Sequence, residues 1–259
     1  MKFMNLDEKY SGDDAYFAVV LIAEEGEVSY GKGASKGAYE IIKASEHLEY
    51  YDEQFDNEPF ELGIMTADKI PKGKFFVVLG GDHSVSLKSV PEDCSVLILD
   101  AHSDFRYSWN NSMNNHACVA RRLSENHKIG IVGVRSQDKD EMEEIKNNKN
   151  VQILKAYDFN KEKLIEILNK LDNNVYISID VDVFDPSFIR NTGTPEPGGF
   201  FWNDVIEILK VVFSNKNVIG ADIVEFAPEE NFRAEAFSLA KLAYKLMALK
   251  QKFKKKEEN

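Results

Sequence analysis

The sequence predicts an α/β protein built on one mostly parallel β-sheet with helices on both of its faces. Short runs rich in Val, Ile, Leu and Phe alternate along the chain with stretches of helical periodicity. The runs FFVVLG (75–80), SVLILD (95–100) and VYISID (175–180) are apolar almost throughout, as strands buried on both faces must be. Alternation of strands and helices is typical of βαβ units, which need a parallel sheet.

In the first half of the chain, the apolar run at 15–23 predicts a buried strand. Residues 33–48 carry apolar side chains at helical steps and predict a helix. Strands follow at 75–80 and 95–100, and a second helix is predicted at 116–126. These elements already give the strand–helix order of a doubly covered sheet.

The second half of the chain repeats this alternation with shorter connections. Its predicted strands are the β-rich apolar runs, and its predicted helices are the amphipathic stretches between them. In chain order we expect strands at 128–134, 151–155, 175–180 and 218–225, and helices at 138–148, 161–171, 203–213 and 234–250.

The chain is expected to form a single domain over residues 1–259. No internal repeat or linker divides it, and its 43% apolar and 29% charged residues are ordinary for a globular fold. A chain of this size can bury roughly three quarters of its unfolded surface. The only low-complexity segment is the charged tail at about 251–259, which is expected to fray.

Composition argues against several classes of protein. Asp and Glu outnumber Lys and Arg by 44 to 32. The resulting net charge of −12 disfavours nucleic acid as a partner and suits a cationic small molecule or a metal ion.

The two cysteines, Cys94 and Cys118, do not make a disulfide framework and indicate a reducing compartment. The longest apolar run is far shorter than the roughly 20 residues of a membrane span, and residues 1–10 lack the features of a signal peptide. We therefore expect a cytoplasmic protein with no membrane partner.

Polar side chains gather where three of the predicted strands end. Ligands of parallel sheets bind beyond the carboxyl ends of the strands, so these side chains are expected to share one site. Residues i and i+2 of an extended segment point the same way, which places Asp100 with His102 and Asp180 with Asp182. The expected metal ligands are His83, Asp100, His102, Asp104, Asp180 and Asp182.

This ligand set predicts a pair of divalent metal ions. Four neighbouring carboxylates would raise one another's pKa values until some were protonated, unless cations offset their charge. Two divalent ions supply that charge. Oxygen and imidazole ligands without thiolate favour Mn, Fe or Mg over structural zinc, and Mn²⁺ is our choice. A single Asp after a strand is commonly a turn or cap residue, but three such clusters at three strand ends favour a metal site.

Five segments together resemble the signature sequences of the ureohydrolase family, which includes arginase and agmatinase. They are GGDHS (80–84), DAHSD (100–104), SIDVDVFDP (178–186), TGTPEPGG (192–199) and DIVEFAP (222–228), and they occur in the family's order. The resemblance runs from Val28 to the closing helix. It implies a three-layer αβα sandwich with an eight-stranded parallel sheet, two Mn²⁺ ions and a trimer or hexamer.

The resemblance also implies a role for each matched residue. Asp100 and Asp180 would bridge the two metal ions. His83 and Asp104 would complete one metal site, and His102 and Asp182 the other. The implied reaction splits a guanidino group into urea and an amine.

Two further residues match the family outside the ligand set. His116 falls where the family carries a proton-transfer histidine, and Glu225 where a carboxylate grips the substrate guanidinium. Bound metals can lower the pKa of water to about 7 and so supply a nucleophile. Asp104 could then take a proton and stabilise the tetrahedral intermediate, while His116 passes a proton to the leaving amine. Catalytic roles are thus predicted for His116, Asp104 and Glu225.

The sequence favours agmatine as the substrate. Arginases carry a segment after the second motif that binds the amino-acid end of arginine, whereas here residues 108–118 read SWNNSMNNHAC. Two segments depart from the family pattern, GASKG (33–37) and FIRN (188–191), and both are expected to border the mouth of the site, where Arg190 could change the polarity. Arginine, guanidinobutyrate, formiminoglutamate and a longer N-substituted agmatine stay open, as does a non-catalytic metal-binding relative.

Overall fold

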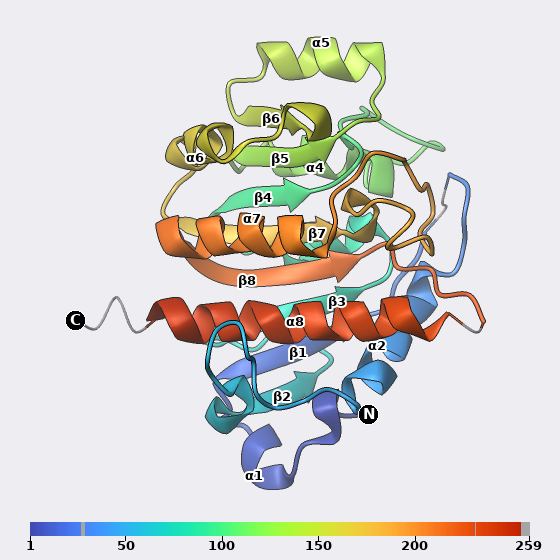
Figure 1. Ribbon diagram of the computed structural model, residues 1–259. Coiled ribbons are helices and arrows are strands. Elements are labelled where there is room, and N and C mark those ends of the chain that lie inside the picture. Colours follow the sequence, from blue (N-terminus) through green and yellow to red (C-terminus); the bar gives the residue numbers. More distant parts are fainter. Residues whose placement is uncertain (27–28, 231, 255–259) are drawn as a thin grey trace.

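The computed structural model describes residues 1–26, 29–230 and 232–254, and the sheet at its centre has eight strands (Figure 1). The strand order is β2-β1-β3-β8-β7-β4-β5-β6, and every neighbouring pair is parallel. The strands are β1 (Phe17–Ile22), β2 (Ile64–Ala67), β3 (Phe75–Gly80), β4 (Ser95–Leu99), β5 (Ile129–Val134), β6 (Val151–Lys155), β7 (Asn174–Asp180) and β8 (Asn217–Val224).

Helices cover both faces of the sheet and give three layers. Four helices, α2, α6, α7 and α8, pack on one face, and α3, α4 and α5 belong to the other. Figure 1 shows α7 and α8 running side by side across the near face. The α-helices of the described chain are α1 (Glu8–Ser11), α2 (Gly37–Ser45), α3 (Ser86–Ser89), α4 (Val119–Leu123), α5 (Lys139–Asn147), α6 (Lys161–Lys170), α7 (Trp202–Asn215) and α8 (Arg233–Lys254).

Alternate residues of the central strands feed two separate hydrophobic clusters. In β3, Val77 and Leu79 face the cluster beneath α2 and α8, while Phe76 and Val78 face the cluster on the opposite side. Each cluster is closed by helices, so the strands carry apolar side chains on both faces. This burial explains why FFVVLG shows no alternation of apolar and polar residues.

The predicted fold class is confirmed, and so are all seven predicted strands. The structure adds one strand, β2, at the edge of the sheet. It has only four residues, IMTA, and three of them are half-buried, so its apolar pattern is short and weak. Edge strands of this length give little periodicity from which a sequence could predict them.

Two predicted helices are shorter than expected. The segment 33–48 begins with a 3₁₀ turn at Ala34–Lys36, and α2 then ends at Ser45. The segment 116–126 likewise begins with a 3₁₀ turn at His116–Cys118 before α4. At both places a side chain caps the first turn: Glu25 accepts from the Ala34 backbone N–H, and Asn115 accepts from the Ala117 backbone N–H.

At the other end of the chain, α8 continues through Lys254. The rest of the charged tail, 255–259, lies outside the described residues. Among the helices of the described ranges, none combines the length and the apolar character that crossing a membrane requires.

Candidate metal centre and active site

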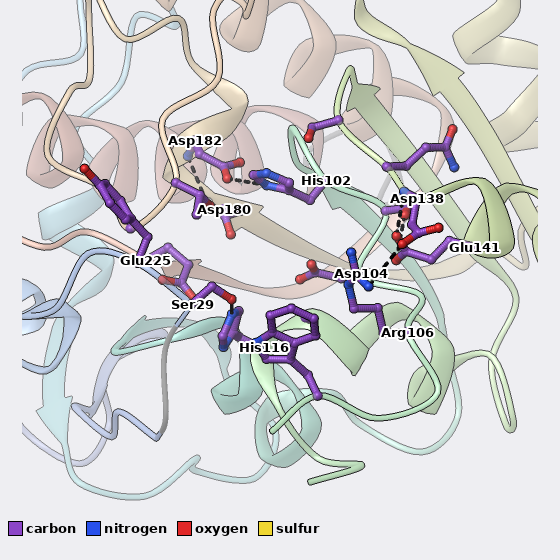
Figure 2. A pocket seen from close by; sticks show the side chains of 18 of the residues that line it. Ser29, His102, Asp104, Arg106, His116, Asp138, Glu141, Asp180, Asp182 and Glu225 are labelled. Carbon is purple, nitrogen blue, oxygen red and sulfur yellow. Dashed lines mark hydrogen bonds and ion pairs between the residues drawn. The ribbon is translucent and has the colours of Figure 1, made fainter. Parts of the chain in front are cut away.

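The predicted site residues lie beyond the carboxyl ends of four neighbouring strands, β3, β8, β7 and β4. Since parallel strands end at the same edge, segments far apart in the chain meet there (Figure 2). Gly81, directly after β3, packs so closely on the backbone of Glu24 that a Cβ would lie 1.8 Å from the Glu24 carbonyl oxygen. Only glycine fits at this position, and it brings the His83 segment against the loop that follows β1.

His83 lies at the centre of the first group of predicted ligands. It begins a 3₁₀ turn after β3, which Asp82 caps by accepting a hydrogen bond from the Ser84 backbone N–H at 2.9 Å. The Nδ1 atom of His83 faces three carboxylate oxygens, Asp104 Oδ2 at 2.9 Å, Asp100 Oδ2 at 3.3 Å and Asp180 Oδ2 at 3.5 Å. Three acidic side chains, two from the segment after β4 and one from the end of β7, therefore converge on one imidazole nitrogen.

His102 anchors the second group. Its Nδ1 atom lies 2.8 Å from Asp182 Oδ2 and 3.7 Å from Asp100 Oδ1. Backbone N–H groups hold these carboxylates, because Asp182 accepts from Ala101 at 2.9 Å and Asp100 accepts from His102 at 2.6 Å. Asp180 in turn accepts from the backbone of Asp182 at 2.9 Å. Asp100 thus faces both histidines, one with each carboxylate oxygen.

Crowding and burial disturb the acid–base properties of this cluster. Burial, reinforced by the charges of Asp182 and Asp104, raises the pKa of Asp100 to about 7. Burial and the same kind of repulsion raise the pKa of Asp180 well above its usual range. Burial opposes a charge on His102, but Asp182 outweighs it and raises the pKa of the ring to about 10. Bound cations would offset the repulsion between these neighbouring carboxylates.

The geometry of the donor atoms fits a pair of divalent metal ions. Among the described residues, two groups offer ligand atoms that all lie within 4.8 Å of one another: His83 with Asp100 and Asp104, and Asp100 with His102 and Asp182. The two groups share Asp100. The donors are carboxylate oxygens and imidazole nitrogens with no thiolate, a set that suits Mn, Fe or Mg.

His116 and Glu225 lie beside this cluster, and both line the same cavity. His116 opens a 3₁₀ turn, which Asn115 caps by accepting from the Ala117 backbone N–H at 3.1 Å. Burial lowers the pKa of His116. The ring therefore favours its neutral form, which can accept a proton and pass it on.

Glu225 follows β8 with a left-handed backbone, φ 65°, which is unusual for a residue other than glycine. Its backbone N–H donates to Gly81 at 2.8 Å, and its Oε1 accepts from the His83 backbone N–H at 2.7 Å. Burial raises the pKa of Glu225 to about 8. A strained, buried carboxylate beside a cavity is a typical binding or catalytic group.

The cavity has a volume of about 480 Å³, within the range of small-molecule sites. Besides the predicted residues, its walls include Ser29, Arg106, Asp138 and Glu141, which the sequence interpretation did not assign (Figure 2). Glu141 and Asp138 carry a recognisable sequence signal, since they form a capping box at the start of α5. That signal predicts a helix start, and nothing in it indicates that the helix start borders a site.

The two segments that depart from the family pattern do not line the cavity. Residues 33–37 are not among the lining residues, and this part of the chain reaches the cavity through Ser29, Tyr30 and Gly31 instead. The side chain of Arg190 stacks on Phe232 at 4.9 Å and lies 3.5 Å from Glu235. Phe232 and Glu235 do not line the cavity either, and the expectation that Arg190 changes the polarity of the mouth stays a prediction.

Comparison with known proteins shows that the chain is similar to one family in both sequence and structure. Residues 61–249 match the model of the arginase family. An N(1)-aminopropylagmatine ureohydrolase from Synechocystis is 32% identical over 95% of this chain and 92% of its own length. An agmatinase from Pyrococcus horikoshii is 32% identical over 91% of this chain and 92% of its own length. The crystal structure of agmatine ureohydrolase of Thermoplasma volcanium superposes with a TM-score of 0.83 at 28% identity, covering 94% of this chain and 92% of that one.

Proposed function

The chain belongs to the arginase family of hydrolases acting on guanidino C–N bonds, and we propose that it releases urea from a linear polyamine, with agmatine as the first candidate. The observation that carries the proposal is the convergence of Asp100, Asp104 and Asp180 on one imidazole of His83, next to the buried carboxylate of Glu225. Such a site can hold cations at two places, metal ions in the cluster and a guanidinium beside it.

The two groups that share Asp100 support the proposed metal ligands. His83 and Asp104 would hold one ion, and His102 and Asp182 the other. Asp100, a member of both groups, and Asp180, whose Oδ2 lies 3.5 Å from His83 Nδ1, would serve both ions. Two divalent ions, Mn²⁺ in this proposal, would lower the pKa of water to about 7 and supply the nucleophile when bound. The chain's own residues then bind the substrate and move its protons.

Glu225 is the proposed guanidinium-binding residue. One of its oxygens accepts from the His83 backbone N–H, and because each carboxylate oxygen can accept two hydrogen bonds, both oxygens can still bind the substrate. A guanidinium donates two parallel N–H groups, and a carboxylate is the acceptor that matches them. Burial raises the pKa of Glu225 to about 8, and an adjacent cation would lower that pKa again and keep the carboxylate charged.

Two residues are proposed to handle protons. Asp104 uses one oxygen toward His83 and lines the cavity, so its second oxygen can accept a proton from water as the water adds to the guanidino carbon. His116, which burial keeps neutral, can first accept a proton and then deliver it to the leaving nitrogen. Water adds to the guanidino carbon, the C–N bond breaks, and urea and a protonated amine leave.

The charge of the cavity supports a polyamine substrate. Beyond the proposed metal ligands, the described residues that line it include three carboxylates, Asp138, Glu141 and Glu225, and one guanidinium, that of Arg106. Arg106 is already engaged, with Nη1 3.3 Å from Asp138 and its guanidinium over the Trp109 ring at 4.6 Å. A dication such as agmatine complements this excess of carboxylates.

N(1)-aminopropylagmatine is the second candidate substrate. The Synechocystis relative bears that activity in its name, and the resemblance between the two chains extends over most of both. The longer substrate adds a further amine to the same guanidino end. It would therefore use the same proposed chemistry at Glu225 and His116 and differ only in how much of the cavity it occupies.

The test is urea release from the Mn²⁺-loaded protein, with agmatine, N(1)-aminopropylagmatine, arginine and guanidinobutyrate measured in parallel. The proposal expects the highest kcat/KM with one of the two polyamines. Preference for arginine or guanidinobutyrate would overturn the substrate class, and the absence of urea with every compound would overturn the reaction. The predicted trimer or hexamer and the cytoplasmic location stay predictions.

A further inference from the structure

Ser29 and His116 are 87 residues apart in the sequence, yet Ser29 Oγ lies 2.8 Å from His116 Nε2. Figure 2 shows the serine between the ring and Glu225 at the wall of the cavity. A hydroxyl can donate to the nitrogen or accept from it, so this hydrogen bond can persist whether or not Nε2 carries a proton.

The other ring nitrogen offers no alternative support. His116 Nδ1 is buried and has no hydrogen-bond partner among the residues that the structure describes. Within that part of the chain, the hydroxyl of Ser29 is therefore the group that orients the ring. A proton leaving or entering His116 on the cavity side would use Nε2, the nitrogen that Ser29 holds.

The loop that carries Ser29 is fixed on its far side by Glu25. The carboxylate of Glu25 accepts from the backbone N–H groups of Gly33 at 2.7 Å and Ala34 at 3.3 Å, and from Ser35 Oγ at 2.8 Å. These bonds lower the pKa of Glu25 against the opposing effect of its partial burial. The loop is thereby anchored to the strand end that precedes it.

The same loop is also fixed from the side of the cavity. The Gly31 backbone N–H donates to the Gly193 carbonyl at 3.1 Å. A Cβ on Gly31 would lie 2.9 Å from Gly193 Cα, so the two backbones are in direct contact and leave no space for a side chain. Clamped at Gly31 and at Gly33, the loop presents Ser29 at a defined position.

We propose that Ser29 is a positioning residue for the reaction, acting through His116 by holding the imidazole at Nε2. The proposal rests on the proposed function, since it takes His116 as the group that protonates the leaving amine. Without the hydroxyl, the ring keeps its place in the 3₁₀ turn but loses the bond that sets its rotation. The substrate contacts of Glu225 are unaffected.

The kinetic test compares Ser29→Ala and Ser29→Thr in the wild-type and His116→Asn backgrounds. Loss of one hydrogen bond predicts a fall in kcat of about fivefold to tenfold for Ser29→Ala, with KM changing by less than about twofold. Thr keeps the hydroxyl and should restore most of kcat. In the His116→Asn background, Ser29→Ala should have no further effect, because two residues that act as a unit are non-additive.

Ser35→Ala is the matched control. Ser35 lies on the same loop, but its hydroxyl faces Glu25, which keeps its bonds to Gly33 and Ala34. Activity within about twofold of wild type is expected. Equal losses from Ser29→Ala in both backgrounds, or a rise in KM at constant kcat, would overturn the proposal and make Ser29 a substrate contact.

A second measurement does not depend on activity. The chain has five histidines, so ¹⁵N spectra of the imidazoles can be assigned in the metal-free protein. Ser29→Ala should shift the Nε2 resonance of His116, and Ser35→Ala should leave it unchanged. An unshifted resonance overturns the proposal. A shifted resonance in a protein that makes no urea would leave the Ser29–His116 contact established and reject the proposed function instead.

Discussion

The ring of His83 and the hydroxyl of Ser178 form a hydrogen bond of 3.0 Å, and a third residue fixes its direction. Ser178 Oγ donates to Asp222 Oδ1 at 2.7 Å, so it accepts from Nε2–H of His83. All three side chains are completely buried. This arrangement keeps a proton on Nε2 and turns Nδ1, which can bind a metal ion once it has lost its own proton, toward the three carboxylates.

Ser178→Ala is expected to weaken metal binding. Partners of ligating histidines typically contribute 10- to 100-fold to metal affinity, and we expect a loss of about that size, measured by titration of Mn²⁺ into the metal-free protein. Ser95→Ala is the control, because it removes a buried serine from β4 that bonds to Asp172 away from the site. Equal affinity in the wild type and Ser178→Ala would show that the hydrogen bond does not support the ligand.

Metal binding is expected to strengthen as the pH rises. In the metal-free protein, hydrogen bonds to Asp100 and Asp104 overcome burial and raise the pKa of His83 well above its usual value. Asp182 likewise raises the pKa of His102 to about 10. At neutral pH both rings therefore hold a proton on Nδ1 that a metal ion must displace. Each proton released makes the affinity rise about tenfold per pH unit below the pKa.

Calorimetric titration of Mn²⁺ in buffers of different ionisation enthalpy counts these protons. A positive number released near pH 7.5 is the expected result. His127→Gln should release the same number, because the ring of His127 bonds to the carbonyl of Cys94 outside the cluster. Binding that is independent of pH and of buffer would contradict the protonation state derived from the hydrogen bonds.

Glu225→Gln is expected to lose substrate binding while keeping the fold of the site. The amide retains an oxygen that can accept from the His83 backbone N–H, but it carries no charge for the guanidinium. Replacing a charge-assisted pair by neutral bonds predicts a fall in kcat/KM of roughly 100-fold. Metal content by elemental analysis should not change. Near-normal kcat/KM with the preferred polyamine would remove Glu225 from substrate recognition.

Asp185 is expected to stabilise the loop over the site in a pH-dependent manner. Its carboxylate accepts from Ser187 Oγ at 2.6 Å and from the backbone of Gly198 at 2.8 Å, among other donors. The hydrogen bonds from Ser187 contribute most to lowering the pKa of Asp185 to about 2. The folded pKa is below the unfolded one, so this stabilisation is present above about pH 4 and is lost as the pH falls toward 2.

Asp185→Asn should therefore lower the Tm at pH 7 by about 2 °C or more, and the difference from wild type should shrink between pH 5 and pH 2. Calorimetry of the metal-free protein across this range is the measurement. Asp158→Asn, which changes an exposed aspartate elsewhere, serves as the control. A Tm difference that is constant with pH would exclude a contribution from the ionised carboxylate.

Local sequence patterns were sufficient to predict most of the fold. FFVVLG, SVLILD and VYISID are apolar throughout because both faces of the sheet are covered, and all three are central strands of the structure. The polar clusters behind them meet because parallel strands end at one edge. The prediction that Asp100 and His102 face one site agrees with the 3.7 Å between Asp100 Oδ1 and His102 Nδ1.

Only the tertiary structure decided which residues surround the proposed metal-binding side chains. In the sequence, Asp222 is simply one polar residue in an otherwise apolar strand. Its hydrogen bond with Ser178 depends on the register of β8 against β7, which pairs the two residues. The left-handed backbone of Glu225 is likewise set by Gly81 and His83 on another strand end.

The sequence by itself determined the fold class and the edge of the sheet where the polar clusters meet, and it predicted the metal ligands there, because periodicity and strand-end position are local properties. Only the folded chain decided which loop closes the cavity and which hydroxyl orients His116. Ser29 lies 87 residues from that ring, and the contact exists because hydrogen bonds to Glu25 and to Gly193 hold the loop in place. A contact at such a separation depends on the path of the whole chain, which no local pattern records.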